Sequence, residues 1–254
     1  MNTAQADAAA WLRRWDAQQT RYIPHRAERF IAVVEALAAL AGRPDPTVLD
    51  LGCGPGSLSV RVLERLPQAA VVAIDADPLL LEIGRRAHPD EPRLHWLDAD
   101  LRDPAWVNRL PAAPPVDAAV SSTALHWLDA EALQRLYADL GRVLKPGGVY
   151  IDADRLGNGD AGPRLDTAAR AVADGLAVAA HADAETWTDW WDAAEAEPGY
   201  ADAVAERRRR AFEHPDDDAA PPLDTHLAGL RAAGFSEVGT VWQRGNDRVL
   251  VAVR

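Results

Sequence analysis

A glycine-rich segment that follows a short apolar run constrains the fold of this chain more than any other feature. Residues 48–57 read Val-Leu-Asp-Leu-Gly-Cys-Gly-Pro-Gly-Ser. An apolar run that ends in a tight glycine turn is typical of a buried strand that leads into a helix beside a nucleoside ligand. The pattern therefore predicts an open, mostly parallel α/β sheet with a ligand at the carboxyl end of its first strand.

The spacing of these glycines differs from that of the dinucleotide-binding motif. The dinucleotide motif has its third glycine three positions after the second, where this chain has Ser57. Asp50 precedes the turn, and a carboxylate there would repel a pyrophosphate but attract an ammonium group. The turn is thus predicted to bind a cationic nucleoside. A nicotinamide oxidoreductase of the short-chain type is also disfavoured because no lysine stands four residues after any tyrosine.

A second apolar run, residues 71–74, ends in Asp75. A carboxylate at the end of this strand can accept two hydrogen bonds from a ribose diol. Strand and helix signals then alternate over residues 47–153, which predicts parallel strands joined by right-handed crossovers. Ligands of such sheets bind at the carboxyl ends of the strands, so the residues that follow each strand are the candidates for a site.

The Asp50-x-Gly52-x-Gly54-x-Gly56 motif and Asp75 together resemble the class I S-adenosylmethionine-dependent methyltransferase family. Further segments are similar to this family in order along the chain: 97–101, 116–121, 144–151 and 230–235, the last followed by two β-like runs. The resemblance covers residues 45–154 and 223–254. It implies a doubly wound, Rossmann-like α/β sheet of seven strands with a closing antiparallel hairpin.

The resemblance also implies S-adenosyl-L-methionine as the cofactor and S-adenosyl-L-homocysteine as its product. In the family, an acid of the third segment reaches the adenine amino group. The cofactor-binding residues expected on this basis are Asp50, Gly52, Gly54, Gly56, Asp75, Ala76, Asp98, Ala99, Asp100, Leu101 and Ser121.

Four segments are predicted along the chain: an N-terminal helical segment (1–44), the cofactor-binding core (45–154), a helical cap insertion (155–222), and the closing helix and hairpin of the core (223–254). In the third segment, helical periodicity replaces the strand–helix alternation. A cap at this place would lie above the site, supply the substrate chamber and exclude water.

His126 is the main candidate for a catalytic residue. It follows the fourth predicted strand on the ligand side, and an imidazole suits a general base near neutral pH, although a structural histidine bonded to the backbone remains an alternative. Tyr22 and His25 flank a bend at Pro24 and are weaker candidates of the same kind. The substrate-binding residues expected are His126, Asp154, His181, Trp187 and Trp191. The tryptophans at 187, 190 and 191 either line the pocket or attach the cap to the core.

Composition limits the partners. A net charge of −12 disfavours binding to nucleic acid, and the basic cluster Arg207–Arg210, with acidic residues on both sides, is predicted to be a solvated helix face. No apolar run approaches the roughly 20 residues of a membrane helix. The single cysteine, Cys53, and the scattered histidines predict neither a disulfide nor a metal site. A cytoplasmic protein with a small-molecule substrate is expected, and a homodimer is an open alternative to a monomer.

The sequence thus predicts a methyltransferase that acts on an oxygen, nitrogen or carbon nucleophile of a small molecule. Two alternatives stay open at this point. One is a catalytically silent S-adenosylmethionine-binding regulatory or partner subunit, because the firmest assignments concern cofactor binding. The other is a methyltransferase that acts on a macromolecule.

Overall fold

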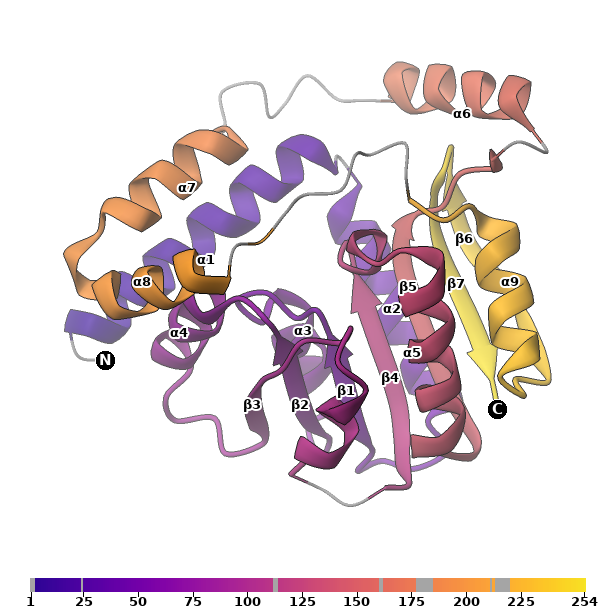
Figure 1. Ribbon diagram of the computed structural model, residues 1–254, viewed down its shortest axis with the longest axis horizontal. Coiled ribbons are helices and arrows are strands. Elements are labelled where there is room, and N and C mark those ends of the chain that lie inside the picture. Colours follow the sequence, from indigo (N-terminus) through magenta and orange to yellow (C-terminus); the bar gives the residue numbers. More distant parts are fainter. Residues whose placement is uncertain are drawn as a thin grey trace.

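The sheet has seven strands in the order β3-β2-β1-β4-β5-β7-β6 (Figure 1). The computed structural model describes residues 3–23, 25–111, 114–159, 162–176, 185–210, 212 and 220–254. The strands are β1 (Thr47–Leu51), β2 (Ala70–Asp75), β3 (Leu94–Asp98), β4 (Val116–Ser122), β5 (Leu144–Arg155), β6 (Glu237–Arg244) and β7 (Asp247–Val253). The first five pair in parallel, whereas β7 runs antiparallel to both β5 and β6. The predicted doubly wound sheet with a closing hairpin is therefore confirmed.

Helices cover both faces of the sheet, because its parallel strands contribute buried apolar side chains to both faces. The helices are α1 (Thr3–Tyr22), α2 (Arg26–Leu40), α3 (Ser57–Arg65), α4 (Pro78–Ala87), α5 (Ala130–Val143), α6 (Pro163–Leu176), α7 (Trp187–Ala196), α8 (Ala201–Arg210) and α9 (Leu223–Ala232), with short 3₁₀ helices η1 (Pro104–Arg109), η2 (Leu125–Trp127) and η5 (Pro198–Tyr200). Side chains of α2 and α3 fill the core on one face, and those of η1, α5 and α9 fill it on the other.

The strand order reverses at β1, which pairs with β2 on one side and with β4 on the other. The register sets Leu51 opposite both Ile74 and Ser121, so the three strands end at nearly the same level. The loops that follow them separate at this point to the two faces of the sheet. Such a reversal is where open α/β sheets bind their ligands.

The turn after β1 depends on Gly52. Its φ of +68° is one that residues with a Cβ rarely adopt. A Cβ at this position would lie 2.4 Å from the Cβ of Ala124, in the loop after β4. Glycine therefore lets the turn after β1 and the loop after β4 approach closely.

The helices outside the sheet lie in two places (Figure 1). α1, α7 and α8 pack with α4 around a third apolar cluster that contains Trp11, Trp15, Trp190 and Trp191. In contrast, α6 lies beside β6, away from α7 and α8. His181, Pro24 and the acidic run at 216–218 lie outside the described residues. None of the described helices combines the length and the apolar character that crossing a bilayer requires.

Two helical glycines give opposite predictions for substitution by alanine. At Gly175 of α6 a new Cβ meets nothing within 4 Å, whereas at Gly141 of α5 it would lie 2.5 Å from the backbone oxygen of Ala233. Alanine is the better helix former, so Gly175→Ala should raise the free energy of unfolding by up to about 1 kcal/mol. Gly141→Ala should lower it by about 1–3 kcal/mol, because α9 must move away. Urea denaturation measures both, and a stabilising Gly141→Ala would contradict this packing.

Candidate cofactor and substrate site

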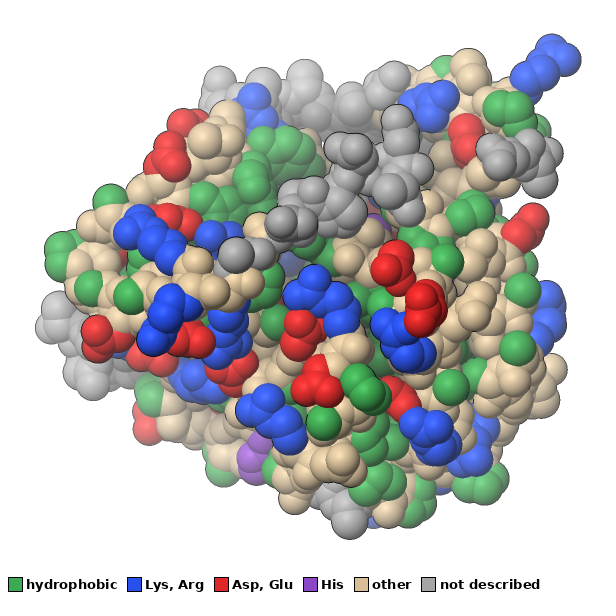
Figure 2. Space-filling model, in the orientation of Figure 1, with side chains coloured by type: hydrophobic (Ala, Val, Ile, Leu, Met, Phe, Trp, Pro, Cys, Tyr) green, Lys and Arg blue, Asp and Glu red, His purple; other side chains and the backbone are tan. Residues whose placement is uncertain are grey.

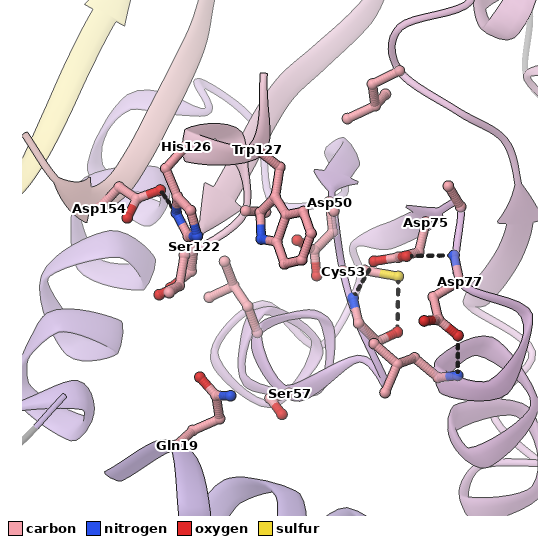
Figure 3. A pocket seen from close by; sticks show the side chains of 18 of the residues that line it. Gln19, Asp50, Cys53, Ser57, Asp75, Asp77, Ser122, His126, Trp127 and Asp154 are labelled. Atoms are coloured by element: carbon pink, nitrogen blue, oxygen red, sulfur yellow. Dashed lines mark hydrogen bonds and ion pairs between the residues drawn. The ribbon is translucent and has the colours of Figure 1, made fainter. Parts of the chain in front are cut away.

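A cavity of about 580 Å³ opens at the carboxyl ends of β1, β2 and β4 (Figure 3), a size typical of small-molecule sites. Its wall also includes side chains from α1, α2, α7 and α8. His126 and Asp154 lie at one end of the view, Asp75 and Asp77 lie at the other, and Trp127 and Asp50 lie between them. Two chemically different ends thus share one cavity.

Asp75 is held rigidly at the end of the cavity that it shares with Asp77. Its Oδ2 accepts a hydrogen bond from the backbone N–H of Gly54 (2.7 Å), and its Oδ1 accepts one from that of Asp77 (2.8 Å). Each carboxylate oxygen can accept a further bond, so both remain available to a diol. Burial raises the pKa of Asp75 to about 6.

Asp50, between Asp75 and Trp127 in Figure 3, is buried. Its Oδ2 accepts a hydrogen bond from the Ser59 hydroxyl (2.5 Å). Burial, together with the charge of Asp75, raises the pKa of Asp50 to about 7. A positively charged ligand at this end would favour the ionised form of both acids. The end is therefore suited to a cationic nucleoside, which agrees with the sulfonium and ammonium groups of S-adenosylmethionine.

Most of the predicted cofactor-binding residues lie in the cavity wall: Asp50, Gly52, Gly54, Asp75, Ala76, Ala99, Asp100 and Leu101. Three do not. Gly56 starts α3, and the hydroxyl of Ser121 donates to the backbone oxygen of Leu51 (2.9 Å), which ties β4 to β1. Asp98 is engaged by Arg210 of α8, whose Nη1 and Nη2 donate to its two carboxylate oxygens at 2.6 and 2.8 Å.

The basic run of α8 divides into two pairs. Arg208 and Arg209 are exposed, as the sequence predicted, with side chains 66% and 73% accessible. The prediction is wrong for Arg207, whose side chain is 22% accessible and binds Asp77 after β2. Arg210 is exposed, but it binds Asp98 at the end of β3. Figure 2 accordingly displays basic and acidic side chains next to one another in this region. These pairs fasten α8 beside the cofactor end.

At the opposite end of the cavity from Asp75, the Nδ1 of His126 lies 2.9 Å from Oδ2 of Asp154 (Figure 3). Burial would raise the pKa of Asp154, but the charge and hydrogen bond of His126 outweigh it and bring that pKa to about 2. Asp154 is thus ionised at neutral pH, and its charge stabilises positive charge on the imidazole. The sequence identified both residues but not their contact.

Of the other aromatic and histidine residues considered for substrate binding or catalysis, some line the cavity and others do not. Trp187 and Trp191 line the cavity, whereas Trp190 is fully buried and packs edge-on against Trp15, with ring centroids 4.9 Å apart. Tyr22 also lines it, and its hydroxyl accepts the N–H of Trp187 (3.0 Å). His25 is not part of the wall; its Nδ1 lies 3.6 Å from Oε1 of Glu28.

The residues of the wall that sequence reasoning missed include Gln19, Arg26, Arg29, Ser57 and Trp127. Gln19 has a signal that could have revealed it, since Trp11, Trp15 and Gln19 recur every four residues on one face of α1. The amide of Gln19 points toward the middle of the view in Figure 3, whereas the hydroxyl of Ser57 donates to Oδ1 of Asp16 (2.6 Å). Within the described parts of the chain, no three His, Cys, Asp or Glu side chains are grouped so as to hold a metal ion.

Comparisons with known proteins agree with this geometry. Residues 48–148 match a family described as "Methyltransferase domain". Trans-aconitate 2-methyltransferase of Azoarcus sp. (strain BH72) is 41% identical over 135 residues, which are 53% of this chain and 48% of that protein. The namesake enzyme of Rhodococcus jostii (strain RHA1) is 34% identical over 150 residues, 58% and 52% of the two chains. The chain thus spans about half the length of these relatives.

A third relative, the malonyl-[acyl-carrier protein] O-methyltransferase of Halalkalibacterium halodurans, is 27% identical over 125 residues, 49% of this chain and 45% of that protein. Among solved structures, an O-methyltransferase family protein from Burkholderia thailandensis superposes with a TM-score of 0.55 at 18% identity, covering 93% of this chain and 62% of the other. The similarity of that structure supports the fold. Together with the glycine turn and Asp75, the comparisons support the resemblance of residues 48–148 to the class I S-adenosylmethionine-dependent methyltransferases.

The two kinds of arginine on α8 can be tested against each other. Arg207 donates to Asp77 (2.7 Å) and Glu195 (2.8 Å), and its guanidinium lies 3.9 Å from the ring centroid of Trp191. Arg207→Ala should therefore lower the free energy of unfolding by about 1–3 kcal/mol. Arg209→Ala, which removes an exposed side chain, should change it by less than about 0.5 kcal/mol. Equal losses in thermal or urea denaturation would refute the fastening role of Arg207.

Proposed function

We propose that this protein transfers the methyl group of S-adenosylmethionine to a carboxylate oxygen of a small organic acid. The observation that carries the proposal is the division of one cavity into an acidic end, formed by Asp75 and Asp50, and a basic end that contains His126. The first end suits the cationic cofactor, and the second suits an anionic acceptor. The names of the relatives support the same acceptor class, because trans-aconitate and malonyl groups carry carboxylates.

The cofactor would bind with its ribose at Asp75 and its adenine base along residues 99–101. The Asp75 carboxylate would accept hydrogen bonds from the ribose hydroxyls. Its hydrogen bonds from the backbone N–H groups of Gly54 and Asp77 keep it oriented. The glycine turn leaves room for a ligand against the backbone. When bound, the cofactor supplies an activated sulfonium methyl group, so the protein needs chiefly to align the acceptor and exclude water.

The acceptor would bind at the other end. The imidazole of His126, oriented by Asp154, and the guanidinium of Arg155 would attract a carboxylate. The N–H groups of Gln19 and Trp127 are further donors in the wall. Trp187 and Trp191 would cover the apolar part of the acceptor. A carboxylate is already a nucleophile, so no proton has to leave it before transfer.

A hydroxyl acceptor is a second candidate, favoured by the 2.9 Å contact between His126 and Asp154. A histidine oriented by an ionised acid is a suitable general base for a hydroxyl group. The two candidates require opposite charge states of His126. A carboxylate would need the imidazolium, and a hydroxyl would need the neutral imidazole.

The acidic end gives a prediction for cofactor binding. With pKa values of about 6 and about 7, Asp75 and Asp50 carry protons near pH 5 and lose them by about pH 8. Only the ionised acids attract a cation, so affinity for S-adenosylmethionine should rise about tenfold or more over this range, with protons released on binding. Calorimetry in two buffers of different ionisation enthalpy measures both effects. Asp50→Asn should weaken the pH dependence of the affinity for S-adenosylmethionine above pH 6.

The exposed Asp45, which pairs with Arg43, provides a control for titration of the ligand itself. Asp45→Asn should bind the cofactor with the pH dependence of the unmodified chain. An affinity that stays flat from pH 5 to pH 8 in all three proteins would show that Asp50 and Asp75 do not face the cation.

The acceptor class gives a second prediction. When small mono-, di- and tricarboxylic acids are incubated with methyl-labelled cofactor, at least one should form a methyl ester that mild alkali cleaves. For that acid, kcat/KM should fall as pH rises through the titration of His126, and His126→Gln should lower it at least about tenfold. Alkali-stable products, with a rate that falls at low pH, would instead establish the hydroxyl candidate. Cofactor binding without transfer to any acceptor would favour a binding subunit.

A further inference from the structure

Arg29 of α2 is fully buried, yet its side chain lies in the wall of the cavity. Its Nη1 donates to Oδ1 of Asp247 on β7 (2.8 Å), and its Nη2 donates to the hydroxyls of Ser122 (3.1 Å) and Thr123 at the end of β4. One guanidinium therefore joins three segments that are distant in sequence. A buried charge is retained only where such partners compensate the loss of water.

Thr123 has a backbone conformation that is unfavourable for its type. Its φ is +56°, and it is the single non-glycine residue with positive φ in the part of the chain that the structure describes. A β-branched residue adopts this region only when its surroundings hold it there. Two bonds do so: the hydroxyl contact with Arg29, and the backbone N–H of Thr123, which donates to the oxygen of Ala153 (2.9 Å).

The strained residue determines where His126 lies. Thr123 redirects the chain from β4 into η2, which carries His126 three residues later. The N–H of Thr123 is bonded to β5 immediately before Asp154, the partner of His126. Ala124 is fixed from the other side by its close approach to Gly52. The conformation at Thr123 therefore sets the separation between His126 and Asp154.

The charge of Arg29 acts on the same pair. The titratable and charged groups around it are Asp152, Asp154 and Arg155 on β5, Asp247 on β7, His126 on η2, and Arg26 on its own helix. Asp152 lies two residues before Asp154 on the same face of β5 and is fully buried. Burial and the charge of Asp154 raise the pKa of Asp152 well above its usual range, which favours its neutral form. Arg29 then compensates the ionised acids that remain beside it.

We propose that Arg29 is a positioning residue for the His126–Asp154 pair: it holds the strained Thr123 turn and balances the buried acids of β5 and β7. Arg29 acts on the acceptor through His126 and does not bind it. The inference rests on the proposed function only in that His126 is the group that contacts the acceptor. The placement of His126 itself can be measured without any turnover.

Arg29→Lys and Arg29→Gln, made in the full chain, test the proposal. Lysine keeps the charge but cannot bond Asp247 and the two hydroxyls at once. For the acid found to be methylated, both variants should lower kcat at least about tenfold, with KM and the affinity for S-adenosylhomocysteine changed less than about threefold. A raised KM with unchanged kcat would overturn the proposal, because it would identify Arg29 as a ligand of the acceptor.

A titration independent of activity separates this proposal from the proposed function. Nuclear magnetic resonance of ¹⁵N-labelled histidine, with His126 assigned by His126→Gln, follows its protonation. Loss of a neighbouring positive charge favours the imidazolium, so Arg29→Gln should move the midpoint upward by about 0.5–1 pH unit, and Arg29→Lys should move it less. Unchanged midpoints in folded variants would overturn the proposal even if acid methylation is demonstrated. A shift without methylation of any acid would support Arg29 and refute the proposed acceptor.

A second pair of variants covers the case in which Arg29 cannot be replaced without unfolding. Thr123→Ala removes the hydroxyl that Arg29 bonds, and Thr123→Ser keeps it. Thr123→Ala should lower kcat at least about fivefold, and Thr123→Ser should recover most of the loss. Equal activity of the alanine and serine variants would overturn the claim that the contact with Arg29 holds the turn.

Discussion

The reversal of strand order at β1 is the constraint on which the rest of the structure depends. Because β1 pairs in parallel with both β2 and β4, three strands end together, and the loops that follow them diverge. This divergence leaves the cavity that Asp75 and His126 enter from opposite sides. Asp50, Asp75 and Asp154 lie at strand ends and His126 lies shortly after β4, so a shift in register would separate them.

The site is organised by charge as well as by shape. Burial raises the pKa values of Asp75 and Asp50, so a positive ligand would favour the ionised form of both acids. Asp154 shows the reverse behaviour, since His126 and Arg29 already compensate its charge.

The sequence predicted the features that depend on neighbouring residues. The glycine turn, the apolar strands and the closing hairpin follow local patterns, and their order along the chain was sufficient for the sheet. Contacts between distant segments could not be predicted in this way. Arg210 binds Asp98, 112 residues away. Because neighbouring residues do not reveal this partner, the sequence predicted a solvated face for the basic run of α8. Likewise, helical spacing could not distinguish Trp190, which is core, from Trp191, which lines the cavity.

The central claim is that one cavity holds the cofactor at Asp75 and delivers its methyl group toward His126. A crystal structure of the protein with S-adenosylhomocysteine tests this most directly. The account predicts both ribose hydroxyls within hydrogen-bond distance of the Asp75 carboxylate, with the sulfur directed to the part of the cavity between Trp127 and His126. A ribose bound away from Asp75, or a sulfur directed away from His126, would contradict it.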